Sequence, residues 1–343
     1  MTRHRVARRE FIAGIAALGA GVLLPRAESS AQTVATPHRI DVHHHLFPPT
    51  YIAAALAMKV EGPRADWTPA RSLEEMDRAG VAVSIMSIAA AGVSFLDDAG
   101  TRRLARECND YAARLAADHP GRFGIFASLP MPHVENTLRE IEYAFGTLKA
   151  DGVVFVTSYG DKWLGDPAFA AVMDELNRRK AVVYTHPTTP KCCKNLVPDV
   201  GESIIEYGTD TTRTIASLVF SGTAMRCPDM KVIFSHAGGS MPFLTERFVR
   251  LPLIDKKLAP RGPNGVAYEL KRFYYDTAQA SNPMALSSLL KLVAVSQVLF
   301  GSDFPYRTDT DHVKGLADYG FNTADLMAVE RENAIRLIPR LKA

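Results

Sequence analysis

Histidine and aspartate residues stand at the ends of four short apolar runs, where they could together bind a metal ion. The run RIDVHHH (39–45) ends in three histidines, and VVYTH, VIFSH and LFGSD end in His186, His236 and Asp303. Side chains alternate along an extended strand, so His43 and His45 would share one face. Imidazole nitrogen and carboxylate oxygen suit Zn²⁺, and also Mn²⁺ or Fe²⁺. A single histidine at a strand end is more often an ordinary polar residue, but four such positions together predict a metal site.

Eight short apolar runs recur along the chain, separated by helical patterns. They are RIDVHHH (39–45), VAVSIMSI (81–88), RFGIFASL (122–129), DGVVFVTS (151–158), AVVYTH (181–186), KVIFSH (231–236), RFYYDTA (272–278) and QVLFGSD (297–303). Nearly continuous apolar runs of this kind are typical of parallel strands buried on both faces. Eight strands that alternate with helices predict an α/β protein with a (β/α)8 TIM barrel, whose active site lies at the carboxyl ends of the strands.

The main competing architecture is an open doubly wound sheet, which commonly carries a glycine-rich phosphate loop after its first strand. No such loop follows residues 39–45, and this favours the barrel. Helical patterns fill the intervals. One covers residues 101–121, with Thr101 as the expected N-cap, and another covers residues 210–227. Because no later linker or internal repeat interrupts the chain, residues 38–343 are predicted to form a single domain.

The charge of the chain is unevenly distributed. Of the formal net charge of +3, all is accounted for by residues 1–31, and the remainder holds equal numbers of basic and acidic residues. A neutral remainder gives no reason to expect nucleic acid or an anionic membrane as a partner.

The first 31 residues have the pattern of an export signal. A twin arginine, Arg8-Arg9, precedes an apolar stretch that runs to Leu24, and small residues follow at 29–31. The apolar stretch is shorter than the ~18 residues that a spanning helix needs. We interpret residues 1–31 as a twin-arginine signal peptide and predict a periplasmic protein without a membrane span; the alternative is a disordered basic tail.

The four cysteines are too few and too irregularly spaced for a disulfide framework. Cys192 and Cys193 are adjacent in a polar loop. They are either a loop detail without a role or a disulfide between neighbours, and the sequence leaves both possibilities open.

Four motifs carry a family resemblance. IDVHHHLFPP, THP, FSHAGGSMPF and GSDFPY resemble the amidohydrolase superfamily of metal-dependent hydrolases. Together with the W-x-P motif (67–69) and EEMDRAGV (74–81), they are most similar to the branch of aminocarboxymuconate-semialdehyde, γ-resorcylate and 5-carboxyvanillate decarboxylases. The similarity runs from about residue 40 to the end of the chain.

The resemblance implies a role for each matching residue. It makes metal ligands of four residues, His43, His45, His186 and Asp303. His236 becomes the acid/base beside the metal, and Asp303 is also catalytic as a proton relay. Since DGVVFVTS (151–158) ends without a lysine that could bridge two ions, one divalent ion is expected, with Zn²⁺ ahead of Mn²⁺ and no organic cofactor. Arg64 lies near the family's carboxylate-binding arginine, and Trp67 beside it is predicted to line the substrate site.

The neighbours of the His-x-His pair have expected roles as well. Alternation places His44 toward the helix layer as a structural residue. The same alternation places Asp41 on the face of His43, where it would support the pair from below.

We therefore predict a metal-dependent, non-oxidative decarboxylase of a small aromatic or muconate-type carboxylate. A hydrolase or hydratase of the same superfamily, acting on a lactone, C–C or C=C bond, is the alternative, because the ligands do not distinguish these reactions. A non-catalytic metal or solute binder is a third hypothesis, against which His236 argues, since a binder needs no acid/base. The branch is commonly dimeric, which implies a homodimer.

Overall fold

A parallel sheet positions the rest of the molecule. In a computed structural model, which describes residues 38–60, 62 and 64–342, eight parallel strands pair in the order β1-β2-β3-β4-β7-β8-β9-β10. The strands are β1 (Arg39–His45), β2 (Val81–Ser87), β3 (Phe123–Ser128), β4 (Gly152–Val156), β7 (Val182–His186), β8 (Lys231–Phe234), β9 (Tyr274–Asp276) and β10 (Val298–Leu299). Each of them lies within one of the eight predicted runs. A short antiparallel hairpin, β5 (Ser158–Tyr159) and β6 (Lys162–Trp163), follows β4.

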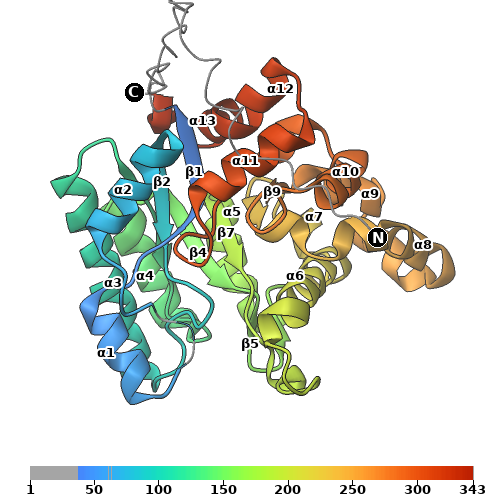
Figure 1. Cartoon of the computed structure of the whole chain (residues 1–343). Helices are drawn as coiled ribbons and strands as arrows, with labels where there is room; N and C mark the ends of the chain where they lie inside the picture. The colour runs from blue at the N-terminus through green and yellow to red at the C-terminus, as the bar shows by residue number, and fades with distance from the viewer. Residues whose placement is uncertain (1–37, 61, 63, 343) are drawn as a thin grey trace, which may run out of the picture. The chain divides into compact units, whose positions relative to one another are not determined.

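Helices surround the strands in Figure 1. They are α1 (Pro49–Ala57), α2 (Pro69–Ala79), α3 (Asp98–Asp118), α4 (Val134–Gly146), α5 (Ala170–Arg178), α6 (Glu202–Phe220), α7 (Thr223–Arg226), α8 (Met241–Ile254), α9 (Val266–Arg272), α10 (Pro283–Leu292), α11 (Asp309–Tyr319), α12 (Thr323–Met327) and α13 (Asn333–Leu337). The alternation of parallel strands and helices confirms the predicted TIM barrel.

The barrel closes between its first strand, β1, and the segment from β10 to Phe304. This junction, called the seam below, has no regular ladder of backbone hydrogen bonds. Beyond the two residues of β10, three backbone hydrogen bonds join the edges: Val42 N–H to the Phe300 carbonyl (3.0 Å), Asp303 N–H to that of His43 (2.8 Å) and His45 N–H to that of Phe304 (2.9 Å). Side chains therefore have to supply part of what holds the seam together.

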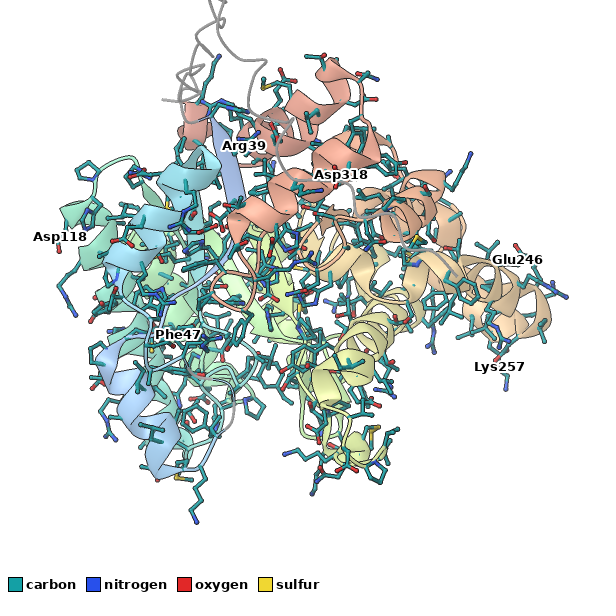
Figure 2. All side chains as sticks on the ribbon, in the orientation of Figure 1. Arg39, Phe47, Asp118, Glu246, Lys257 and Asp318 are labelled. Atoms are coloured by element: carbon teal, nitrogen blue, oxygen red, sulfur yellow. A yellow bond between two sulfur atoms is a disulfide. The ribbon has the colours of Figure 1, made fainter. Side chains whose placement is uncertain are left out.

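An apolar cluster fills the barrel interior. Ile40 and Val42 of β1 pack there with residues from most of the other strands, and with Ile338 and Leu341 near the C-terminus. The C-terminal segment covers the amino-terminal end of the strands, where Glu330 accepts a hydrogen bond from the Arg39 guanidinium at 2.7 Å. Figure 2 labels Arg39 at the start of β1 and Phe47 just past its end, so the carboxyl ends of the strands lie toward Phe47, at the end opposite this segment.

Strand β1 departs from simple alternation. Its pairing with β2 shifts register between Asp41 and His44, as at a β-bulge. The bulge allows Val42 to join the interior cluster while His43, next to it, also points to the strand ends where the site lies. The expectation that Asp41 shares the face of His43 is wrong: its carboxylate contacts the His44 ring at 3.2 Å and reaches His43 only through the backbone N–H, at 2.9 Å.

Two helix boundaries differ from those predicted, and the open question of the two adjacent cysteines is resolved. Helix α3 begins at Asp98 with Asp97 as its N-cap, so the expectation of Thr101 as the cap is wrong. The helix expected at 210–227 begins eight residues earlier and breaks at Gly222, which has a left-handed φ of 84°. Cys192 and Cys193 are joined by a disulfide.

Two predictions concern export and membranes. The proposed signal peptide, residues 1–31, lies outside the described residues. Within the described part of the chain, no helix combines the length and apolar character that crossing a bilayer requires.

Candidate metal centre

Four of the predicted residues meet at the carboxyl ends of the strands. His43 and His45 end β1, His186 ends β7 and Asp303 follows β10. One ligand atom from each lies within 4.8 Å of the others, and all four side chains are buried. Nε2 of His43 lies 3.2 Å from Nε2 of His45, and Asp303 Oδ1 lies 3.2, 3.0 and 3.9 Å from Nε2 of His43, His45 and His186.

In each of the three histidines, the hydrogen-bond partner of Nδ1 determines that Nε2 is the nitrogen without a hydrogen. Nδ1 of His43 lies 3.0 Å from Asp276 Oδ2, Nδ1 of His45 lies 3.2 Å from the Ser87 carbonyl, and Nδ1 of His186 lies 2.8 Å from the Pro187 carbonyl. These oxygens only accept, so each Nδ1 donates its hydrogen, and each neutral ring presents a lone pair at Nε2. Three lone pairs and one carboxylate oxygen thus face a common point.

This donor set fits a divalent cation. Ligands about 2.1 Å from a tetrahedral ion lie roughly 3.4 Å apart, close to the separations found here. Bare ring nitrogens cannot satisfy one another, and Nε2 of His186 has no hydrogen-bond partner among the described residues. A divalent cation at the common point would satisfy all four groups at once.

The pKa values of the cluster residues indicate that their carboxylates attract a positive charge. Burial by itself would raise the pKa of Asp303, but the charge of His43 and the nearby rings of His186 and His236 hold it well below its usual range. Burial would likewise lower the pKa of His43, but Asp276 and Asp303 outweigh burial and raise it to about 10. By contrast, burial lowers the pKa of His186 to about 3. Without a cation, the two carboxylates therefore retain a proton on His43, and a bound ion would displace it.

Asp276, which was not among the predicted residues, holds two of them in place. It ends β9, and its Oδ2 accepts from the His43 ring and from the Tyr184 hydroxyl at 2.9 Å. Its Oδ1 accepts from the backbone N–H groups of His236 (2.9 Å) and Ala278 (3.0 Å). The rule that selected Asp303, a polar residue closing a strand, would have found Asp276 in RFYYDTA.

Gly301 makes the approach of Asp276 to His43 possible. A Cβ at position 301 would lie 2.9 Å from the Cβ of His43 and 3.0 Å from that of Asp276. The first distance is shorter than real Cβ contacts and the second is tighter than most of them, and both neighbouring atoms are bonded directly to the backbone. Only glycine fits at this point of the GSDFPY motif.

His236 lies beside the four converging residues. Its Nε2 is 3.4 Å from Asp303 Oδ2 and has no hydrogen-bond partner among the described residues. Gln279, also missed from the sequence, donates from Nε2 to Asp303 Oδ2 at 2.9 Å. Asp303 therefore directs one oxygen to the three histidines and the other to His236 and Gln279.

The backbone around the centre is strained. His236, Ala237, Gln279 and Asp303 all have left-handed φ values, between 53° and 64°. Such conformations are unfavourable for residues other than glycine, and they persist where the surrounding structure enforces them, as at functional sites. Here they occur just past the ends of β8, β9 and β10.

The two predicted substrate-binding residues are not brought into the cluster. Arg64 pairs with Asp66 at 3.2 Å, and its guanidinium carbon lies 6.0 Å from the centre of the Tyr306 ring, which in turn lies 5.7 Å from the His45 ring. Trp67 is buried and donates its indole N–H to Ser72 at 3.0 Å. Its N–H is occupied, so contact with a substrate would have to use the ring face.

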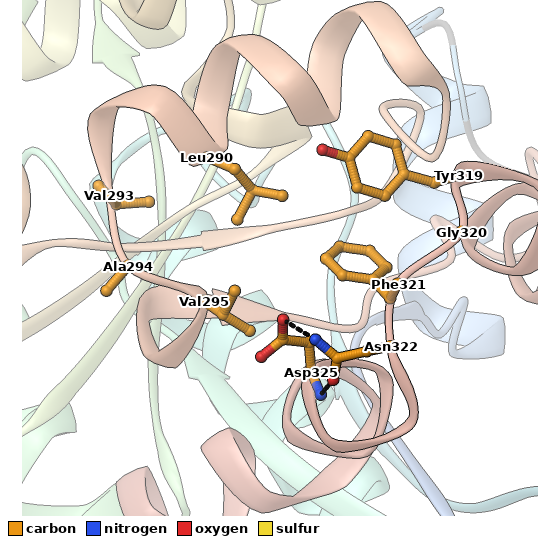
Figure 3. A pocket seen from close by; sticks show the side chains of 9 residues that line it. All are labelled: Leu290, Val293, Ala294, Val295, Tyr319, Gly320, Phe321, Asn322 and Asp325. Carbon is orange, nitrogen blue, oxygen red and sulfur yellow. Dashed lines mark hydrogen bonds between the residues drawn. The ribbon is translucent and has the colours of Figure 1, made fainter.

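A cavity of about 390 Å³ lies elsewhere, between α10 and the segment from α11 to α12 (Figure 3). Its lining contains none of the converging residues. Asn322 and Asp325, two of its polar residues, hydrogen-bond to each other at the start of α12. This cavity therefore contains none of the residues that could bind a metal together, and the cluster at the strand ends is the candidate functional site.

Comparison with known proteins agrees with the geometry. Residues 40–340 match the family described as Amidohydrolase. Decarboxylase yanB of Aspergillus niger is 38% identical, over 89% of this chain and 88% of its own length. The 6-methylsalicylic acid decarboxylase of Penicillium expansum is 35% identical, over 89% and 97%. A solved structure of an amidohydrolase II protein superposes with a TM-score of 0.81 at 29% identity, over 88% of this chain and 99% of its own.

Proposed function

Because the chain belongs to the amidohydrolase family and is a carboxy-lyase within it, as the resemblance in its sequence predicted, we propose that it releases CO₂ without oxidation from a small hydroxyaryl carboxylate. One observation carries the proposal. Nε2 of three histidines and one oxygen of Asp303 converge, and a cation would displace the proton of His43; the unpartnered Nε2 of His236 lies beside the other oxygen of Asp303. A cation site with an acid/base next to it is what this reaction requires.

His43, His45, His186 and Asp303 would hold the ion. When bound, a divalent cation would polarise the oxygens of the substrate and stabilise negative charge on them. Three nitrogens and one oxygen suit Zn²⁺, with Mn²⁺ as the second choice. Loading the metal-free protein with each ion separately and measuring turnover would identify the active one.

His236 would move the proton. Its Nε2–H would protonate the ring carbon that bears the carboxylate, and the C–C bond would then break as its electron pair returns to the ring and CO₂ leaves. Neutral His236 would then need a new proton; its side chain is 12% exposed, although Nε2 itself is buried, so the proton would come through the open site after CO₂ has left. Asp303 Oδ2 lies 3.4 Å from Nε2 and would orient the ring.

The substrate class is tested by CO₂ release from a panel of hydroxybenzoates that includes 6-methylsalicylate, with metal content measured in parallel. The proposal expects release from at least one member by the metal-replete protein. If such protein releases no CO₂ but hydrolyses lactones or hydrates dienoates, the reaction is the hydrolase or hydratase alternative instead.

Export and assembly are further parts of the proposal. The twin-arginine pattern of residues 1–31 supports periplasmic localisation, which fractionation of cells expressing the chain with and without Arg8→Lys and Arg9→Lys would test. The commonly dimeric branch supports a homodimer, and light scattering coupled to gel filtration would measure its mass. Exposed apolar side chains on α8 and α10, among them Phe243, Ile254 and Met284, are suited to cover by a second copy.

A further inference from the structure

A second group of metal-binding side chains lies at the barrel seam, behind the first. Asp41 and His44 come from β1, and Asp309 is the first residue of α11. All three are fully buried, and one ligand atom from each lies within 4.8 Å of the others. This group stands where the ladder between the first and last strands is incomplete.

Asp41 already links the two sides of the seam. Its Oδ1 accepts from the backbone N–H groups of His43 (2.9 Å) and Ser302 (3.1 Å). Its Oδ2 accepts from the Ser302 hydroxyl at 2.6 Å and lies 3.2 Å from Nδ1 of His44. Two backbone donors and one hydroxyl thus hold this carboxylate in place, on both sides of the seam.

His44 can present a bare nitrogen to the same place. Its Nε2 lies 2.9 Å from the Ser72 hydroxyl oxygen, which also accepts the N–H of Trp67. A hydroxyl oxygen can accept two hydrogen bonds, so Nε2 of His44 can carry the ring hydrogen. Nδ1 then directs its lone pair toward Asp41, and the 3.2 Å between Nδ1 and Oδ2 suits two ligands of one ion.

Asp309 is the residue of this group whose carboxylate lacks hydrogen-bond partners among the described residues. Both of its carboxylate oxygens are buried and have no hydrogen-bond partner among the described residues. The nearby Ser302 hydroxyl has one hydrogen, which Asp41 receives. A buried, unpaired carboxylate next to a second carboxylate is strongly unfavourable, so either a proton or a cation has to compensate it.

We propose that Asp41, His44 and Asp309 bind a second divalent cation of the Zn²⁺ or Mn²⁺ type. Two carboxylates balance its charge, and oxygen and imidazole ligands suit both ions. Because the site is fully buried, the ion meets no substrate and acts as a structural link. It ties β1, which carries His43 and His45, to the start of α11 across the open part of the seam.

The metal content of the full chain tests this proposal. Protein stripped with a chelator and reloaded with Zn²⁺ alone, or with Mn²⁺ alone, should hold two ions per chain by mass spectrometry of the bound metal. Asp309→Asn should hold one. Asp311→Asn, an exposed carboxylate in the same helical turn, should still hold two.

The outcomes are separable. A wild-type chain that holds one ion overturns the proposal without any variant, and shows that a proton compensates Asp309. Two ions in both the wild type and Asp309→Asn also overturn it, since the second ion then lies elsewhere. If Asp309→Asn does not fold, His44→Gln serves in its place, with the same expected loss of one ion.

Discussion

Replacement of Asp276 by asparagine should uncouple His43 from its role as a ligand. The carboxylate accepts four hydrogen bonds, two at each oxygen. The amide oxygen of asparagine can replace only one carboxylate oxygen, and the two fixed backbone N–H groups at Oδ1 will claim it. The amide NH₂ then points at Nδ1 of His43, which donates a hydrogen itself.

That conflict is relieved only if the His43 ring changes tautomer. Nδ1 would then accept from the amide, and Nε2 would carry the hydrogen and lose the lone pair that faces the metal position. Partners of this kind typically contribute 10–100-fold to metal affinity. We therefore expect Zn²⁺ to bind Asp276→Asn weaker by that factor, about 1.4–2.7 kcal/mol.

The measurement is competition for Zn²⁺ against a chromophoric chelator, with urea unfolding to establish that the variant is folded. Tyr184→Phe is the matched control. It removes another donor to Oδ2 but leaves the His43 tautomer unchanged, so it should weaken binding by less than about threefold. Wild-type affinity in a folded Asp276→Asn, or an equal loss in Tyr184→Phe, would refute the tautomer reasoning.

Three further predictions follow from the same structure. His236→Asn should lower CO₂ release by about 10²–10⁴-fold while the metal content stays the same, and loss of the metal as well would assign His236 to binding. Gly301→Ala should lower the free energy of unfolding by about 1–3 kcal/mol and weaken Zn²⁺ binding, because the new Cβ meets His43 and Asp276. Unchanged urea unfolding together with unchanged Zn²⁺ affinity would contradict the close contact. Burial lowers the pKa of His312 from 6.5 to about 4, so as pH falls from 6.5 the unfolded chain takes up a proton that the folded chain refuses. Stability that is present above pH 6.5 is therefore lost toward pH 4, and the free energy of unfolding should be lower by about 2 kcal/mol at about pH 5. Urea unfolding of the wild type and His312→Gln at about pH 7.5 and about pH 5 measures this contribution, which the variant should lack. An equal loss of stability in both proteins would be evidence against the role of His312.

The strand-end residues could be predicted because parallel strands share one polarity. Once the eight runs are strands, His186 and Asp303 must lie at the same end of the barrel as His43 and His45. The same rule would have selected Asp276. Gln279 could not be found in this way, because it lies in a loop and reaches Asp303 through a left-handed backbone that the sequence does not show.

Features that depend on packing escaped the sequence patterns. Simple alternation placed Asp41 with His43, and only the pairing of β1 with β2 reveals the bulge that turns it toward His44. Thr101 has the properties of a cap, but Asp97 lies one turn earlier and accepts the N–H of Gly100. Trp67 belongs to a recognisable motif, although its N–H is occupied by Ser72 in the folded chain.

The seam has a consequence for the order of events during folding. The ligands of the first centre come from the first strand and from the residue that follows the last one, 258 positions apart for His45 and Asp303. The full set of four ligands therefore forms only when the last strand closes against the first. Closure of the barrel and tight binding of a cation are thus coupled, and each would stabilise the other.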